Sequence, residues 1–272
     1  ENRTYDQIFG DMEQGNGDPE LCIFGREVTP NHHALASQFA LLDNYYCNGV
    51  NSADGHAWTT EGNVTDHLEK SFGGFTRSYT WGNDPLTYSS SGFIWDNVLA
   101  HGLSFRNFGE MDYANPIPED ASFEAIYRDF VEDAGDIGFS QNIGIERLSR
   151  YSSPTYPGWN MRIPDVLRAE AFLAELAGFE ERGDFPNFTI VYLPNDHTSG
   201  TSPGAPTPRA QVADNDLALG RVVEGITHSR FWPTTCIFVI EDDPQAGFDH
   251  VDGHRSLCLV VSPYTARGRV VS

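Results

Sequence analysis

A short apolar run that ends in three acidic residues is the feature of this sequence that most constrains its fold. The run Ile237 to Ile240 is typical of a strand buried on both faces of a parallel sheet. Glu241, Asp242 and Asp243 follow it directly. Carboxylates at the end of a buried strand repel one another and lose hydration unless a cation joins them. Because ligands of open α/β sheets bind at the carboxyl ends of strands, this pattern predicts a divalent-metal site. A solvated acidic loop is the alternative.

The alternative carries weight because acidic residues are abundant. The chain has 39 Asp+Glu against 17 Lys+Arg, and a formal net charge of -22. Three other acidic pairs lie in helix-like or loop-like contexts that favour solvated surface, namely Glu119-Asp120, Glu132-Asp133 and Glu180-Glu181. Only the cluster at 241–243 follows a buried-strand pattern and is itself followed by histidines, His250 and His254.

A second strand pattern also ends in candidate ligands. The run Phe188 to Leu193 is apolar and precedes Asp196 and His197. The chance that acid and imidazole groups follow two strands at the same edge of a sheet is smaller than the chance that they follow a single strand. The second pattern therefore favours the metal site over the acidic loop.

The order of the elements predicts the fold class. Helical periodicity or capping signals favour helices at 30–43, 94–101, 123–134, 164–178 and 211–230, and apolar runs predict strands at 103–108, 188–193, 236–240 and 257–261. Alternation of helices with continuously apolar strands indicates an α/β sandwich, with a mostly parallel central sheet and helices on both faces. Residues 110–162, rich in acids, prolines and aromatics, are expected to form an insertion or a lid.

Length, charge and cysteine spacing exclude several classes of protein. The 272 residues suffice for a core, and we expect one domain over 1–272 that is an excerpt of a longer chain. No segment approaches the about 20 apolar residues of a membrane span. The negative charge argues against nucleic-acid binding. An acidic chain with one lysine and many Tyr and Trp residues favours an extracytoplasmic location. No CxxC pair is present, and a disulfide between Cys22 and Cys47 stays open.

A candidate nucleophile lies in the stretch Asn48 to Trp58. Ser52 stands among small residues ahead of a predicted helical turn, whose free N–H groups can bind an anion. A Ser/Asp turn that caps a helix is the alternative. The sequence has no GxxxxGK[ST] loop, no HExxH and no G-x-S-x-G elbow. His56 is a candidate contact for phosphate oxygens, with an ordinary structural histidine as the alternative.

Four stretches together resemble a known family. They are Glu1-Asn-Arg-Thr-Tyr-Asp-Gln-Ile-Phe-Gly10, Ser52-Ala-Asp-Gly-His-Ala-Trp58, Leu193-Pro-Asn-Asp-His-Thr198 and Glu241-Asp-Asp followed by Asp249-His-Val-Asp-Gly-His-Arg255. They are similar, in this order, to motifs of the bacterial phosphoesterase family that includes phospholipases C and an acid phosphatase. That family belongs to the alkaline phosphatase superfamily. The match is nearest to an uncharacterised branch that is often joined to β-propeller repeats.

The resemblance implies a role for each matching position. It implies an alkaline-phosphatase-like sandwich in which Glu1, Asn2, Asp242 and Asp243 bind a divalent cation and Ser52 is the nucleophile. A second cation would take its ligands from Asp196, His197, His250 and His254. One or two ions are implied, and Zn, Mn, Ca and Mg are not distinguished. The phospholipases have Thr where this chain has Ser52.

The expected activity is hydrolysis of a phosphate ester through a phosphoseryl intermediate. Two rivals stay open. One is a sulfatase or phosphonate-cleaving relative, although the sulfatase signature, Cys or Ser followed by x-Pro-x-Arg, is absent after Ser52. The other is a non-catalytic, metal-stabilised binding domain at a cell surface.

Overall fold

The computed structural model describes residues 1–72, 84–245 and 247–272, and it divides into two compact units. Unit 1 comprises Glu1–Gly55, Asn195–Thr198 and Thr207–Ser272. Unit 2 comprises His56–Pro194 and Ser199–Pro206.

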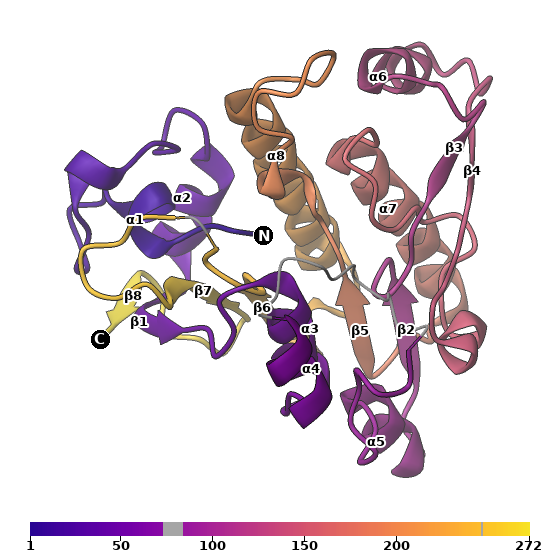
Figure 1. Cartoon of the computed structure of the whole chain (residues 1–272), viewed down its shortest axis with the longest axis horizontal. Helices are drawn as coiled ribbons and strands as arrows, with labels where there is room; N and C mark the ends of the chain where they lie inside the picture. Colours follow the sequence, from indigo (N-terminus) through magenta and orange to yellow (C-terminus); the bar gives the residue numbers. More distant parts are fainter. Residues whose placement is uncertain (73–83, 246) are drawn as a thin grey trace. The chain divides into compact units, whose positions relative to one another are not determined.

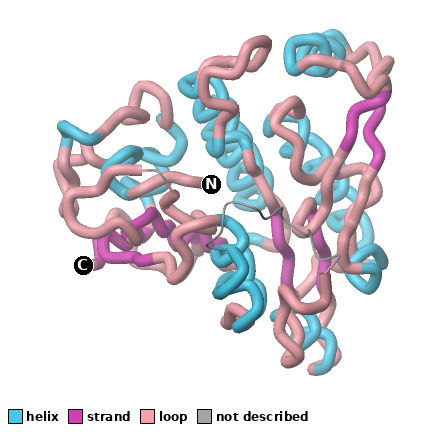
Figure 2. The backbone as a smooth tube through the Cα atoms, viewed as in Figure 1, coloured by secondary structure: helices cyan, strands magenta, loops and turns pink. Residues whose placement is uncertain are grey.

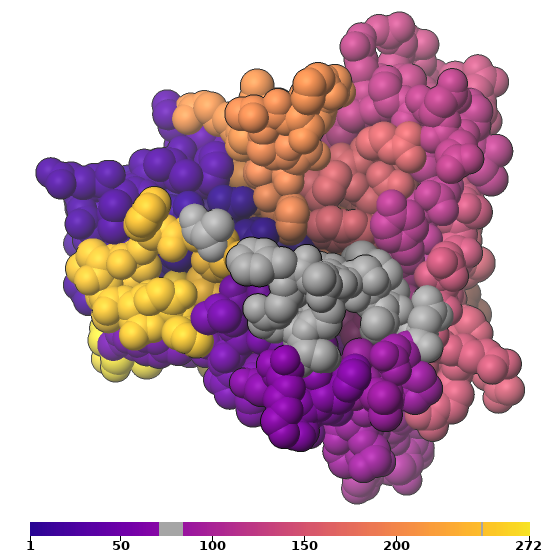
Figure 3. All heavy atoms as spheres, in the orientation of Figure 1, coloured from indigo at the N-terminus to yellow at the C-terminus, as the bar shows by residue number. Residues whose placement is uncertain are grey.

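Unit 1 is built on a four-stranded mixed sheet. Its order is β6 (Ile237–Ile240), β7 (Arg255–Val261), β1 (Ala40–Tyr46) and β8 (Arg269–Val271), as Figure 1 shows. β7 is antiparallel to both of its neighbours, and β8 runs parallel to β1. The sheet therefore joins the first 50 residues to the C-terminal 40, and the indigo and yellow segments of unit 1 lie against each other in Figure 3.

Helices and short turns complete unit 1. The helices are α1 (Tyr5–Phe9), α2 (Pro30–Gln38), the start of α3 (Ser52–Glu61) and α8 (Pro208–His228), with 3-10 turns at Pro19–Leu21, Asn195–His197 and Trp232–Thr234. The stripe predicted for the last helix is buried, including Val212, Val223 and Ile226. Asp216 on this helix accepts the backbone N–H groups of Asn31 and His32, and so caps α2 from outside.

Unit 2 contains a parallel strand pair and an antiparallel strand pair, drawn in magenta in Figure 2. The parallel pair is β2 (Phe105–Phe108) with β5 (Phe188–Val191), and the antiparallel pair is β3 (Asn115–Ile117) with β4 (Gly138–Ser140). The helices are α4 (Asp66–Phe72), α5 (Ile94–Ala100), α6 (Phe123–Glu132), the 3-10 turn Glu146–Arg150 and α7 (Asp165–Arg182).

Aromatic stacking holds one end of unit 2 together. The ring of Trp95 stacks on Phe93 at 4.2 Å and on Phe105 at 5.8 Å, and Phe105 stacks on Phe188 across the strand pair at 5.6 Å. This continuous stack ties α5 to both strands, since each ring buries apolar area against the next.

The α/β class predicted from the sequence is confirmed, but the central sheet is mixed and not mostly parallel, since β7 runs antiparallel to both β1 and β6. The strands β5 and β6, predicted to deliver ligands to one edge of one sheet, belong to different sheets among the described residues. Two elements are also corrected. The predicted helix 30–43 ends at Gln38, because Ala40, Leu41 and Leu42 form ladder pairs with β7 on one side and β8 on the other. The strand 237–240, predicted to be buried on both faces, is an edge strand of a mixed sheet, and the side chain of Phe238 is 65% exposed. Local periodicity could not reveal either of these long-range pairings.

Two further findings concern the chain as a whole. None of the helices among the described residues has the length and apolar character needed to cross a membrane. The four cysteines, Cys22, Cys47, Cys236 and Cys258, are free thiols.

Candidate metal and nucleophile site

The three acids that follow β6 have different environments. Glu241 and Asp243 are buried, and Asp243 is 0% exposed, while Asp242 is partly buried. Both carboxylate oxygens of Asp243 accept hydrogen bonds: Oδ1 from the backbone N–H of Gln245 at 2.6 Å, and Oδ2 from the hydroxyl of Ser52 at 2.7 Å. The acids are therefore part of a built site and not a solvated loop.

The predicted nucleophile meets a predicted ligand directly. Ser52 is the first residue of α3 and is 7% exposed, and its Oγ donates to Asp243 Oδ2 at 2.7 Å. The two residues are separated by 191 positions in the sequence. A hydroxyl buried against a carboxylate is oriented before any substrate arrives, which is what a serine nucleophile needs.

Gly55 explains how the first turn of α3 comes so close to the acids. A Cβ at this position would lie 2.2 Å from the backbone oxygen of Asp242 and 2.6 Å from its carbonyl carbon. Because backbone atoms cannot rotate away, only glycine fits there without moving the helix. The glycine of the Ser52-Ala-Asp-Gly-His motif therefore sets the spacing between α3 and Asp242.

The N-terminal stretch supplies two more residues with candidate ligand oxygens, Glu1 and Asn2. Arg3 holds this stretch against the turn that follows β5: its Nε donates to the backbone oxygen of Asp196 at 2.9 Å, and Nη2 donates to that of His197 at 3.1 Å. Asn2 has a φ of 60°, a left-handed conformation that asparagine adopts more readily than most residues with a side chain.

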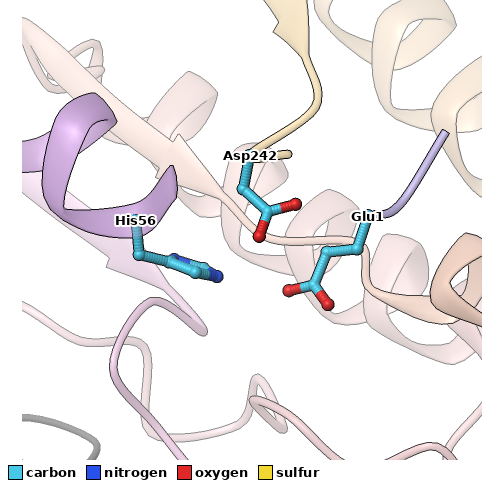
Figure 4. Close-up of side chains that lie close together, drawn as sticks. All are labelled: Glu1, His56 and Asp242. Atoms are coloured by element: carbon cyan, nitrogen blue, oxygen red, sulfur yellow. The ribbon is translucent and has the colours of Figure 1, made fainter. Parts of the chain in front are cut away.

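These residues fit a divalent cation. Figure 4 shows the carboxylates of Glu1 and Asp242 facing one another, and an oxygen of each lies within 4.8 Å of the other. Asn2 Oδ1 is buried and has no hydrogen-bond partner among the described residues. A buried, unpaired amide oxygen is costly unless a ligand satisfies it. With carboxylates beside it, the donor set is the all-oxygen kind preferred by hard divalent ions.

Glu241, the first acid of the cluster that predicts the metal site, contacts the N-terminal residue. Its Oε2 lies 2.6 Å from the backbone nitrogen of Glu1, and the same nitrogen donates to Asp196 Oδ2 at 2.5 Å. Burial, and then the negative charge of Asp196, raise the pKa of Glu241 to about 8. Two buried carboxyl groups, those of Glu241 and Asp196, therefore lie close together next to the candidate cation ligands.

Each of the three histidines predicted as ligands of a second metal has a hydrogen-bond partner. His197 Nδ1 is hydrogen-bonded to the Thr198 carbonyl at 2.9 Å. His254 Nδ1 is bonded to the backbone oxygen of Cys47 at 2.9 Å. His250 Nδ1 lies 2.7 Å from Asp6 Oδ2.

His250 belongs to a separate network centred on a buried arginine. Asp6, Asp249 and His250 place ligand atoms within 4.8 Å of one another. The guanidinium of Arg255, 0% exposed, already binds both acids there, at 3.0 Å to Asp6 and 2.9 Å to Asp249. Among the described groups of three close ligand atoms, neither His250 nor His254 joins Glu1 or Asp242.

His56 lies one helical turn after Ser52 on α3 and begins unit 2. Its Nδ1 is 2.9 Å from Glu110 Oε1, and its ring meets Tyr192 edge to face at 5.4 Å. Glu110 was missed in the sequence, although it stands just beyond a predicted strand, as Glu241 does. The rule applied to strand 236–240 would have identified it.

The fold is similar to that of a solved protein of the alkaline phosphatase superfamily. One similar solved structure is a protein of this superfamily from Vibrio parahaemolyticus, with a TM-score of 0.51 and 17% identity over 90% of this chain and 57% of that one. Another is Ps i-CgsB in complex with a neocarrahexaose, with a TM-score of 0.53 and 12% identity over 100% of this chain and 66% of that one. The chain thus spans about three fifths of these structures, and such low identities establish the fold alone. No protein-family model and no curated protein matches the sequence.

Proposed function

We propose that this protein is a metal-dependent hydrolase that cleaves phosphate esters with Ser52 as its nucleophile. The observation that carries the proposal is the 2.7 Å hydrogen bond between Ser52 Oγ and Asp243 Oδ2, which joins the candidate nucleophile to a candidate ligand 191 positions away in the sequence. The fold of the superfamily and the carboxylates around Glu1 support it.

In the proposed mechanism Asp243 orients the Ser52 hydroxyl, and the Ser52 oxygen attacks phosphorus in line with the leaving alcohol. A bond forms between Ser52 Oγ and phosphorus while the ester P–O bond breaks, and the alcohol leaves with a proton. Water then attacks the phosphoserine, which releases phosphate and restores the hydroxyl. The first-turn N–H groups of α3 point toward the end at which Ser52 stands, and they favour negative charge there.

Glu1, Asn2, Asp242 and Asp243 would hold the cation, and Asp196, His197, His250 and His254 stay as proposed ligands of a second one. When bound, a divalent cation supplies charge that favours the ionised serine and the anionic phosphoryl oxygens. The four first-named residues supply only oxygen donors.

The proposal is tested with Ser52→Ala on an aryl phosphate ester, with Ser149→Ala, an exposed serine of unit 2, as the matched control. Turnover is expected to fall by about 10³-fold or more in the first variant and to stay unchanged in the second. Metal content by elemental analysis should be retained in Ser52→Ala and lowered in Asp242→Asn. Wild-type turnover in Ser52→Ala would refute the assignment of the nucleophile.

A sulfate ester is the second candidate substrate. Its support is the likeness of fold to Ps i-CgsB, whose structure contains a neocarrahexaose. The residues after Ser52 are Ala53, Asp54, Gly55 and His56, and they do not follow the sulfatase signature. A panel of phosphate monoesters, phosphate diesters and sulfate esters separates the two activities. A protein that turns over none of them while a chelator lowers its melting temperature would be a metal-stabilised binding domain.

The remaining parts of the proposal concern the setting. We propose that the protein acts outside the cytoplasm, and that it binds a phosphate ester and no nucleic acid. A β-propeller is a candidate neighbouring domain in a longer chain.

A further inference from the structure

Unit 2 contains a buried acid, Glu110, that takes no part in the proposed reaction. Glu110 is 3% exposed, and its two carboxylate oxygens lie 2.9 and 3.1 Å from Nδ1 of His56. A carboxylate buried without a partner is strongly destabilising, so its partner is part of what makes the site stable. Because a carboxylate accepts hydrogen bonds, the Nδ1 atom of the imidazole is the donor.

The backbone of Glu110 is fixed from β2. The side chain of Asn107, 0% exposed, accepts the backbone N–H of Glu110 at 3.1 Å and donates to its carbonyl at 2.9 Å. The same amide donates to Ser152 Oγ at 2.9 Å. Gly109, which lies between Asn107 and Glu110 in the chain, has a φ of 95°, and a Cβ there would lie 2.9 Å from the ring of Tyr156. The turn is therefore built to present Glu110 in one position.

The imidazole is fixed on a second side by aromatic rings. Tyr192 meets it edge to face at 5.4 Å, and Trp159 stacks on Tyr192 at 6.4 Å. The backbone N–H of Tyr192 donates to Phe108 at 3.0 Å, so this ring is also anchored to β2. Figure 4 shows the His56 imidazole projecting from α3, the helix that begins with Ser52.

We propose that Glu110 is a positioning residue, which holds His56 in the tautomer that carries the hydrogen on Nδ1. The other ring nitrogen, Nε2, is then the atom through which His56 acts on the substrate. The inference rests on the proposed function, because it assigns His56 a part in the reaction of Ser52. A histidine oriented in this way by a carboxylate is a common arrangement at catalytic and metal sites.

The first test is the tautomer of His56, measured in the whole protein by two-bond ¹H–¹⁵N NMR and assigned by the loss of signals in His56→Gln. The Nδ1–H tautomer is expected in the wild-type protein. An Nε2–H tautomer there overturns the proposal, whatever the protein catalyses. This measurement is independent of activity, so it separates a failure of the positioning role from a failure of the proposed function.

The second test compares Glu110→Ala with Glu110→Gln, whose amide oxygen still accepts a hydrogen bond. In the Ala variant the tautomer is expected to become mixed and kcat to fall about 10- to 100-fold with little change in KM. The Gln variant is expected to keep the Nδ1–H tautomer and most of kcat, and it remains informative if Glu110→Ala does not fold. Glu175→Gln, which removes a carboxylate paired with Arg106 at 2.6 Å in the same unit, is the control and should leave both unchanged. The proposal is overturned if Glu110→Ala keeps both the wild-type tautomer of His56 and the wild-type kcat. It is also overturned if Glu110→Gln keeps the wild-type tautomer of His56 but loses as much kcat as Glu110→Ala.

Discussion

Replacement of Gly55 by alanine tests the contact between α3 and the acidic strand end. The new Cβ would lie 2.2 Å from the Asp242 carbonyl oxygen, and ordinary contact begins at 3.4 Å, so either α3 or the strand end must move by about 1.2 Å. Overpacking of this kind costs about 1–3 kcal/mol. Alanine in a helix would by itself add about 1 kcal/mol of stability, so a net loss has the opposite sign to the one that helix propensity predicts.

The same movement separates Ser52 from Asp243, whose hydrogen bond is 2.7 Å long. A displacement of about 1 Å at a reacting group can cost about 100-fold in rate, so we expect a loss of that size in turnover of an aryl phosphate ester. The assays are thermal unfolding and steady-state kinetics. A chain of this size shifts its melting temperature by about 2–4 °C for each kcal/mol.

Gly253→Ala is the matched control, because a Cβ at this position in unit 1 meets nothing within 4 Å. It should be close to wild type in both assays. A Gly55→Ala protein that melts at or above the wild-type temperature with unchanged turnover would show that α3 does not depend on this contact, and the geometry assigned to Ser52 would be wrong.

Two further outcomes follow from the structure. Burial would raise the pKa of Asp216, but hydrogen bonds from His32 and from the start of α2 outweigh it and hold this pKa below its usual value. A carboxyl group whose pKa is lower in the folded than in the unfolded state stabilises the fold at pH values above the unfolded pKa of about 4. This contribution to the free energy of unfolding is lost as the pH falls through the folded-state pKa. Asp216→Asn should therefore lose about 1–3 kcal/mol near neutral pH, with the difference from wild type shrinking in acid, whereas the exposed Asp66→Asn should show no such trend. Removal of divalent ions by a chelator should lower the melting temperature of the wild type, and less so that of Asp242→Asn; equal shifts in both proteins would argue against Asp242 as a ligand.

Much of the site was visible in the sequence because strand ends bear a recognisable local pattern. An apolar run followed by Glu241, Asp242 and Asp243 predicts a strand and the location of its ligands. Ser52 before a helical turn is a candidate nucleophile or part of a helix-capping turn, and the resemblance selects the nucleophile. The structure joins Ser52 to Asp243 by a hydrogen bond, and their roles stay predictions. The resemblance added Glu1 and Asn2, which no periodicity would have identified.

The hydrogen-bond partners of other residues could not be predicted from the sequence, because those partners are remote. His250 and His254 follow the acids closely in the sequence, yet His250 pairs with Asp6 beside Arg255, and His254 binds the Cys47 carbonyl. The choice among neighbouring acceptors depends on which segments pack together. Burial then decides the energy, since a buried polar group must take whichever partner the fold brings to it.

The sequence by itself determined the α/β class, the longer helices, four of the strands (β2, β5, β6 and β7), and the acids at the end of 237–240, since these follow from side-chain periodicity and local backbone preference. Only the tertiary structure decided that 40–46 is a strand, that β6 is an edge strand, and that Glu110 orients His56. Strand pairing and buried polar contacts join residues far apart in the chain. Their free energy comes from desolvation at the place where those residues meet, which no local stretch of sequence contains.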